Sequence, residues 1–212
     1  MMRTVSEHQS DLAPAAQTYA VSVLAVSDVN VRMRRVTVGD TSLAGFAPWP
    51  GQDVVLHLSD DGAGVRRRYT VRHLDRDALR FDLDFVLHGP GPGARWAAHA
   101  RVGDRIEIFG PRGKVPIDAA GWQLFVGDES AIPAIAEMIE ALPATASATA
   151  LIDVTDADDE QPVEAAAQAD VRWLHRGGAA PGTSDVLDQA METLALPAAD
   201  RHLYLFGESR TV

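Results

Sequence analysis

The pattern of apolar residues changes near the middle of the chain, and this change limits the folds that the chain can adopt. Up to about residue 117, short runs rich in valine and threonine follow one another, which is typical of β-strands. After residue 117, short apolar runs alternate with segments of helical spacing, which is typical of a parallel sheet covered by helices. The sequence therefore predicts two domains, residues 1–117 and residues 118–212.

The first half is predicted to be all-β, because clusters of Gly, Pro and Asp separate its apolar runs. Residues 80–85 alternate polar and apolar side chains, so this strand should have one face in water. Short strands at this spacing favour a small antiparallel barrel or sandwich, and closing a barrel removes exposed edges. The expected strands are residues 18–26, 31–38, 53–58, 65–72, 79–87 and 105–109.

The second half is predicted to alternate strands with helices. Apolar residues recur at helical spacing over residues 130–142, with Ser130 as the expected N-cap and Pro133 in the first turn. The acidic segment 156–164 is expected to be a solvated loop. Further strands are expected at residues 123–126, 150–154, 171–174 and 202–206, and a second helix at residues 186–196.

Charge and composition exclude several classes of function. The formal net charge is −11, and residues 118–212 hold 17 acidic residues against 4 basic ones, which argues against nucleic-acid binding. The chain has no cysteine, so disulfides and thiolate metal sites are excluded. Its 7 histidines lack ligand spacing, and we expect no metal site.

Nothing in the sequence predicts a membrane protein or a secreted one. No run of about 18 uncharged apolar residues is present, so no membrane span is expected. Residues 1–17 lack the apolar segment of a secretory signal. We therefore expect a cytoplasmic location.

One candidate binding site lies in the run Arg67-Arg68-Tyr69-Thr70-Val71-Arg72. Alternate side chains of a strand share a face, so Arg67 and Tyr69 should point the same way and Thr70 the other way unless the strand bends. An arginine beside an aromatic ring suits a ligand that carries a phosphate and a flat ring. The alternative is an exposed basic strand with a tyrosine in the core.

A second candidate is the glycine- and proline-rich segment 88–97. Glycines allow backbone amides to approach a phosphate, and a helix that follows offers its positive N-terminus. Since prolines lack the N–H group, the useful amides are those of Gly93, Ala94 and Arg95. The alternative is an ordinary loop.

These segments, in this order, resemble the siderophore-interacting protein family, which comprises flavin-dependent ferric-siderophore reductases of the ferredoxin-reductase superfamily. Residues 67–72 are similar to the family's Arg-x-Tyr-Thr flavin motif. Gly127-Asp128-Glu129-Ser130-Ala131-Ile132-Pro133-Ala134 resembles its Gly-Asp-Glu-Thr/Ser-Ala-Leu-Pro-Ala segment, the most specific match. Further matches are residues 84–89, Gly91-Pro92, Arg95-Trp96-Ala97, Pro111-Arg112-Gly113, residues 171–176 and Gly207-Glu208-Ser209.

The resemblance implies an N-terminal antiparallel β-barrel that binds FAD. Arg67 would hold the pyrophosphate, Tyr69 would pack on the isoalloxazine, and Thr70 would reach the reactive N5 edge. Tyr69 and Thr70 are therefore the candidate catalytic residues. The other implied flavin-binding residues are Val71, His88, Gly91, Gly93, Ala94 and Trp96.

The resemblance also implies a C-terminal domain with a parallel sheet that brings NAD(P)H to the flavin. Arg176 follows a predicted strand and is the candidate contact for a 2′-phosphate, and the alternative is an ordinary surface arginine. Arg112 is the candidate contact for the substrate, an anionic ferric siderophore. The other implied nicotinamide-binding residues are Asp128, Glu129, Ser130, Gly207 and Glu208.

The sequence departs from the family pattern in ways that leave alternatives open. Ala94 stands where the family usually has a serine, and Val54 or Val55 where it often has a lysine. Family members continue beyond the position of Val212, so the chain is expected to be a fragment or a short paralogue that could be oligomeric. The first hypothesis is a ferric-siderophore reductase. The alternatives are a general flavin reductase and a binding protein without enzymatic activity.

Overall fold

The computed structural model describes residues 15–60, 63–87, 89, 91–113, 117–118, 120–198 and 200–207. Its first half forms a 7-stranded sheet in the order β4-β3-β7-β1-β2-β6-β5, in which every pairing is antiparallel. The strands are β1 (Gln17–Asp28), β2 (Met33–Gly39), β3 (Asp53–Asp60), β4 (Ala63–Thr70), β5 (Arg72–Asp75), β6 (Arg80–Val86) and β7 (Arg105–Arg112).

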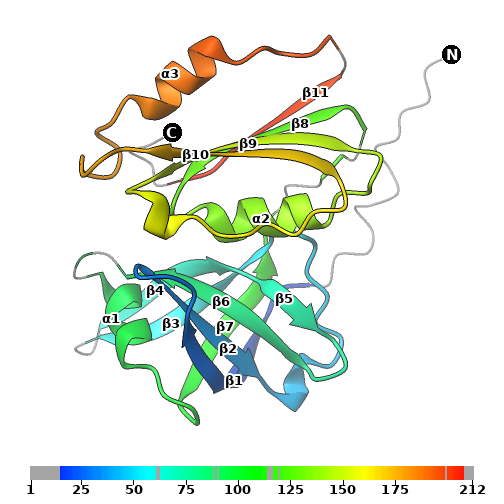
Figure 1. Ribbon diagram of the computed structural model, residues 1–212. Coiled ribbons are helices and arrows are strands. Elements are labelled where there is room, and N and C mark those ends of the chain that lie inside the picture. The colour runs from blue at the N-terminus through cyan, green and yellow to red at the C-terminus, as the bar shows by residue number, and fades with distance from the viewer. Residues whose placement is uncertain are drawn as a thin grey trace, which may run out of the picture.

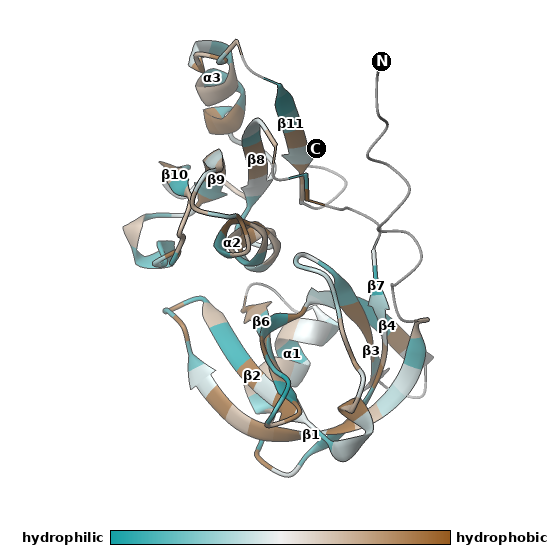
Figure 2. Cartoon of the chain, turned by 90° about the vertical axis from the view of Figure 1, so that its right-hand side faces the viewer, coloured by the Kyte–Doolittle hydropathy of each residue, from teal (hydrophilic) through white to brown (hydrophobic). Residues whose placement is uncertain are grey.

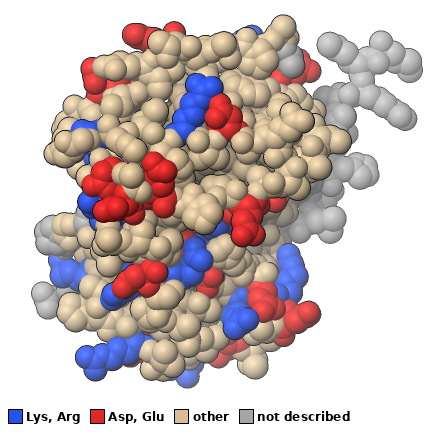
Figure 3. Space-filling model, viewed as in Figure 1, with Lys and Arg blue, Asp and Glu red and all other residues tan. Residues whose placement is uncertain are grey.

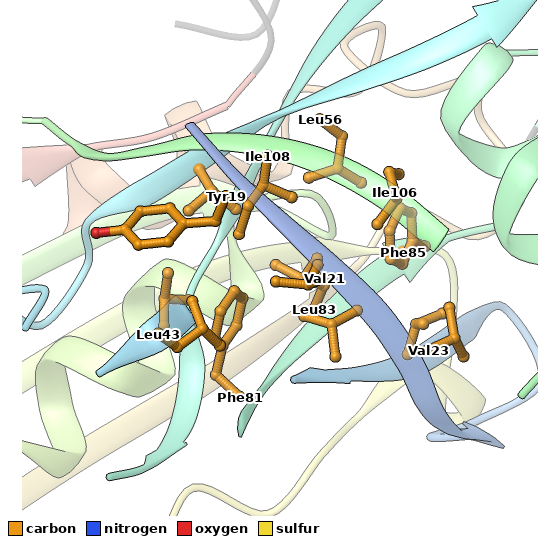
Figure 4. Close-up of a cluster of buried hydrophobic side chains, with 14 of the residues drawn as sticks. Tyr19, Val21, Val23, Leu43, Leu56, Phe81, Leu83, Phe85, Ile106 and Ile108 are labelled. Carbon is orange, nitrogen blue, oxygen red and sulfur yellow. The ribbon is translucent and has the colours of Figure 1, made fainter. Parts of the chain in front are cut away.

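This sheet curls into a half-barrel around an apolar core (Figure 2). Tyr19, Val21 and Val23 alternate along β1 and all point into the core (Figure 4), because successive side chains of a strand face opposite sides. They meet Leu83 and Phe85 of β6 there. Within the described residues β4 and β5 form the two edges of the sheet, so the predicted antiparallel barrel is open rather than closed by hydrogen bonds.

Two short helical elements belong to this half: the 3-10 turn η1 (Thr41–Leu43) and helix α1 (Pro92–His99). The single strand expected over residues 65–72 is divided into β4 and β5. Val71 separates them, since its N–H donates to the carbonyl of Gln52 at 3.0 Å. The chain therefore leaves its pairing with β3 after Thr70 and pairs with β6 from Arg72 onward.

The second half forms a 4-stranded parallel sheet in the order β10-β9-β8-β11. Helices α2 and α3 cover opposite faces of it, and α2 lies between this sheet and the half-barrel (Figure 1). The predicted fold, an antiparallel sheet followed by a parallel one, is confirmed. The elements are β8 (Trp122–Asp128), α2 (Ile132–Glu140), β9 (Ser147–Val154), the 3-10 turn η2 (Ala157–Asp159), β10 (Gln168–His175), α3 (Val186–Thr193) and β11 (Arg201–Leu205).

The start of α2 differs in one detail from the sequence prediction. Pro133 lies in the first turn as expected, but the N-cap is Ala131 and no side chain caps the helix. Ser130 instead donates its Oγ hydrogen to Asp128 Oδ1 at 2.6 Å. The prediction of Ser130 as N-cap was wrong, because the helix begins one residue later and the Ser130 hydroxyl is directed to Asp128 and accepts no N–H of its first turn.

Two sets of ion pairs join the two halves. Arg32, just before β2, pairs with Asp156 at 2.8 Å and Asp159 at 3.0 Å, and Asp159 is buried. Arg72, at the start of β5, pairs with Glu137 at 2.9 Å and Glu140 at 2.7 Å on α2. The expectation that the acidic segment 156–164 is merely solvated was therefore wrong at Asp156 and Asp159.

Acidic side chains gather in one cluster between the upper and lower parts of the molecule, where η2 lies (Figure 3). None of the helices in the described part of the chain is long and apolar enough to cross a membrane. The boundary between residues 117 and 118 stays a prediction.

Candidate functional site

Strand β4 places Arg67 and Tyr69 on the same face of the half-barrel. In the register of β3 and β4, Arg67 lies opposite Leu56 and Tyr69 opposite Val54, and both of these partners are core residues. Arg68 points to the other face, where it pairs with Asp53. The expected shared face of Arg67 and Tyr69 is therefore confirmed.

Arg67 is available to an anion. Its guanidinium donates to the carbonyl of its neighbour Arg66 at 2.9 Å, and it has no acidic partner among the residues that the structure describes. Since Arg67 is exposed, its positive charge faces solvent beside Tyr69.

Three aromatic rings continue from Tyr69 across the half-barrel. Tyr69 packs on Phe85 of β6 with ring centroids 4.1 Å apart, and Phe85 packs on Trp96 of α1 with centroids 5.3 Å apart. Gly93 fits against Tyr69 so closely that a Cβ atom at this position would overlap the tyrosine Oη. Helix α1 therefore approaches the tyrosine only because residue 93 is a glycine.

The N-terminus of α1 lies at the same place. Its N-cap is Gly91, no side chain caps it, and Pro92 occupies the first turn. The N–H of Arg95 donates to the carbonyl of Gly91 at 2.9 Å, so this predicted amide is used within the helix. The amides of Gly93 and Ala94 belong to the first turn, where a helix has no acceptors for its own N–H groups. These amides and Arg67 together favour an anion.

The phenol of Tyr69 has an altered acidity. Burial raises its pKa to about 12, and the positive charge of Arg67 offsets only part of this effect. The hydroxyl is therefore neutral throughout the physiological range.

This shift predicts a measurable loss of stability at alkaline pH. The folded pKa of Tyr69 exceeds the unfolded value of about 10, so its contribution to stability is complete below pH 10 and is lost as the pH rises through about 12. We expect the free energy of unfolding in urea to fall more steeply over this interval in the flavin-free protein than in Tyr69→Phe. If the free energy of unfolding fell equally with pH in both proteins, the raised pKa would not belong to Tyr69.

The carboxyl ends of the parallel strands hold the second group of predicted residues. Asp128 ends β8 and accepts hydrogen bonds from the backbone N–H and the Oγ of Ser130 at 2.9 and 2.6 Å. Gly207 follows β11 with a φ of 144°, in a region that favours glycine. Ligands of parallel sheets bind at this end of the strands.

Arg176 and Glu129 form a buried cluster at the same end of the sheet. Arg176 donates to Glu129 at 2.7 and 2.8 Å, to Asp153 at 3.2 Å and to Thr155 Oγ1 at 2.9 Å. Burial raises the pKa of Asp153 although Arg176 opposes the shift. For Arg176, burial alone would lower the pKa, but hydrogen bonds to Glu129 and Asp153 raise it on balance. The guanidinium assigned to a 2′-phosphate is therefore occupied by partners within the protein.

A cavity of about 310 Å³ lies beside this cluster, between the half-barrel and the parallel sheet. The half-barrel contributes Arg32, Met33 and Val86 to its wall. The sequence analysis missed this cavity and both sets of ion pairs, because they join residues more than 60 positions apart. The residues that line it from the second half include Glu129, Thr155, Asp159, Arg176 and the loop Gly178–Pro181.

Four predicted site residues remain to be placed. Thr70 ends β4 opposite Asp53, on the other face of the strand from Tyr69. Arg112 ends β7 and is exposed, opposite Asp53 of β3 in the sheet register. His88 and Glu208 lie outside the described residues.

Family models match both halves of the chain. Residues 52–115 match the siderophore-interacting FAD-binding domain, and residues 120–212 match the siderophore-interacting protein model. FAD is therefore confirmed as the cofactor expected for this chain. The structure fits it, since Arg67, which has no acidic partner among the described residues, the aromatic face of Tyr69 and the first-turn amides of α1 converge at β4 and α1.

Individual proteins with similar sequences agree with these models. A siderophore utilization protein from T. fusca is 36% identical, with a TM-score of 0.83 over 92% of this chain and 83% of that structure. The ferric vibriobactin reductase ViuB of Vibrio cholerae is 36% identical over 70% of this chain and 55% of its own length. The NADPH-dependent ferric-chelate reductase of Escherichia coli is 29% identical over 91% of this chain and 82% of its own length. The chain thus belongs to the siderophore-interacting protein family.

Proposed function

We propose that this protein is an FAD-dependent oxidoreductase that uses NAD(P)H to reduce ferric siderophores and so releases their iron. In the net reaction, one NAD(P)H and two Fe(III) chelates give NAD(P)⁺, one proton and two Fe(II). The names of the relatives support the substrate class, since one is called a ferric vibriobactin reductase and another a ferric-chelate reductase. The name of the second also supports a nicotinamide as the electron donor.

The observation that carries the proposal is the meeting of Arg67, Tyr69 and the first turn of α1. In this proposal Arg67 and the amides of Gly93 and Ala94 hold the pyrophosphate, because charge-assisted and helix N-terminal hydrogen bonds both favour anions. The aromatic face of Tyr69 carries the isoalloxazine, with Phe85 packed against its ring. Bound FAD would accept a hydride from the nicotinamide and pass two electrons on singly.

Neighbouring residues complete the proposed flavin site. Thr70 ends β4, and in this proposal its hydroxyl would reach the reactive edge of the ring. Trp96 is held against Phe85, which fixes α1 beside the flavin site. Gly91 begins α1, and His88 precedes it in the same segment.

The parallel sheet is proposed to bind the nicotinamide dinucleotide. Asp128, Glu129 and Ser130 at the end of β8, and Gly207 with Glu208 after β11, are the residues assigned to this role. Arg112 is assigned to the anionic chelate, because it is an exposed cation at the end of β7. Each of these roles requires only binding and orientation, since the cofactor supplies the electron-transfer chemistry.

The proposal is tested by an absorbance titration of the purified protein with FAD, followed by anaerobic NADH or NADPH. We expect saturable binding, then bleaching of the flavin, then formation of Fe(II) when a ferric siderophore is added. Equal rates with siderophores, ferric citrate and dyes would indicate a general flavin reductase. Binding without bleaching would indicate a protein that binds flavin but lacks the activity.

The role of Arg67 is tested by Arg67→Gln. We expect FAD to bind about fivefold to tenfold more weakly, because one charge-assisted contact to the pyrophosphate is lost. Arg66→Gln is the matched control, since it removes the same charge from the opposite face of β4. Equal losses of affinity in both variants would contradict the assignment.

A further inference from the structure

Both arginines that line the cavity between the two sheets are already neutralised within the protein. Arg176, only 8% exposed, is held by Glu129 and Asp153. Its Nε has no hydrogen-bond partner among the described residues, but it is buried and therefore not accessible to a ligand.

Arg32 is held in the same way on the opposite wall. It donates to both carboxylate oxygens of Asp156, at 3.0 and 2.8 Å, and to Asp159 at 3.0 Å. Four carboxylates therefore hold these two guanidinium groups, and two of them, Glu129 and Asp159, line the cavity, so its lining has no excess of positive charge. Among the described residues that line the cavity, none supplies a cation without an acidic partner.

The cavity lies at the carboxyl ends of the parallel strands, where proteins with such sheets distinguish NAD from NADP. Glu129, Thr155 and Arg176 directly follow β8, β9 and β10, at the carboxyl ends of the strands. In such sheets a carboxylate accepts a hydrogen bond from the ribose 2′-hydroxyl of NAD, whereas a free arginine accommodates the 2′-phosphate of NADP. A phosphate monoester adds a charge of about −1.5 to −2 at pH 7, which the carboxylates of this cavity oppose.

We infer that this cavity receives the adenosine end of the nicotinamide dinucleotide and selects NADH against NADPH. The inference rests on the proposed function and specifies its electron donor. The Arg176 guanidinium holds the carboxylates of Glu129 and Asp153 in position and does not contact a 2′-phosphate. The carboxylates of Glu129 and Asp159 are the available acceptors for a ribose hydroxyl.

The first experiment measures binding rather than turnover. The FAD-saturated protein is titrated calorimetrically with 5′-AMP and with 2′,5′-ADP, which differ only in the 2′-phosphate. We expect 2′,5′-ADP to bind at least about tenfold more weakly, and KM for NADPH to exceed that for NADH by a similar factor. Equal or tighter binding of 2′,5′-ADP would overturn the inference.

Two variants test the physical reason. Glu129→Gln leaves Arg176 with one carboxylate fewer, and Ala180→Arg adds a cation at an exposed position of the cavity wall. We expect each to reduce the preference for 5′-AMP by about fivefold, since each makes the charge at the cavity wall more positive. Ala180→Arg keeps the test valid if the buried change in Glu129→Gln impairs folding.

Glu160→Gln is the matched control. It removes a carboxylate that pairs with His175 close to the cluster but does not line the cavity. We expect the preference of Glu160→Gln for 5′-AMP over 2′,5′-ADP to match that of the unaltered protein. If Glu160→Gln lost this preference as much as Glu129→Gln, the inference would be overturned. A protein that binds FAD but is reduced by neither dinucleotide would instead overturn the proposed function, and the inference with it.

Discussion

Arg72→Gln is expected to lower the free energy of unfolding by about 2–3 kcal/mol, because it leaves two glutamates without their cation. The Arg72 side chain is only 6% exposed, and the side chains of Glu137 and Glu140 are each 22% exposed. This residual exposure makes the expected loss smaller than for a fully buried pair. Equilibrium unfolding in urea measures the change.

The ion pairs of Arg72 with Glu137 and Glu140 join strand β5, which follows the flavin motif, to helix α2 of the other half. We therefore also expect anaerobic reduction of the bound flavin by NADH to slow, while FAD affinity changes little. Arg80→Gln is the control, since its partner Asp75 is exposed and such pairs contribute about 0–1 kcal/mol. Equal destabilisation in both variants would show that Arg72 has no special role in joining the halves.

Gly93→Ala is expected to weaken FAD binding by about 30-fold, because the added methyl group would occupy the position of the Tyr69 hydroxyl. The ring cannot simply rotate away, since it is packed on Phe85. Either Tyr69 or the first turn of α1 must move, and both belong to the proposed flavin site. A fluorescence titration with FAD measures the loss of affinity.

Gly64→Ala is the control for this substitution. Gly64 lies on β4, the same strand as Tyr69, but a Cβ atom there meets nothing within 4 Å. We expect its FAD affinity to match that of the unaltered protein. If Gly93→Ala also binds FAD normally, then the close approach of α1 to Tyr69 does not shape the flavin site.

Local patterns were sufficient to predict most elements of the fold. The alternation of residues 80–85 predicted β6, and the spacing of apolar residues after Ser130 predicted α2. Such patterns follow from the periods of strand and helix, which depend on neighbours along the chain. The same reasoning placed Arg67 and Tyr69 on one face of β4, which the sheet register confirms.

The sequence analysis was less successful where a polar group had a choice of partners. Ser130 was expected to cap α2 but hydrogen-bonds to Asp128. The acidic residues Asp156 and Asp159 were expected to be solvated but hold Arg32. In each case the residue type was compatible with the predicted role, and a nearby charge in the folded chain provided a better partner.

By itself, therefore, the sequence determined the order of the strands and helices, the change from an antiparallel to a parallel sheet, and the residues of the flavin motif. Only the tertiary structure decided that the half-barrel stays open, that Arg72 joins it to α2, and that Glu129 and Asp153 occupy Arg176. The reason is physical: periodicity reports which side of an element a residue faces, whereas an ion pair depends on which elements meet in space.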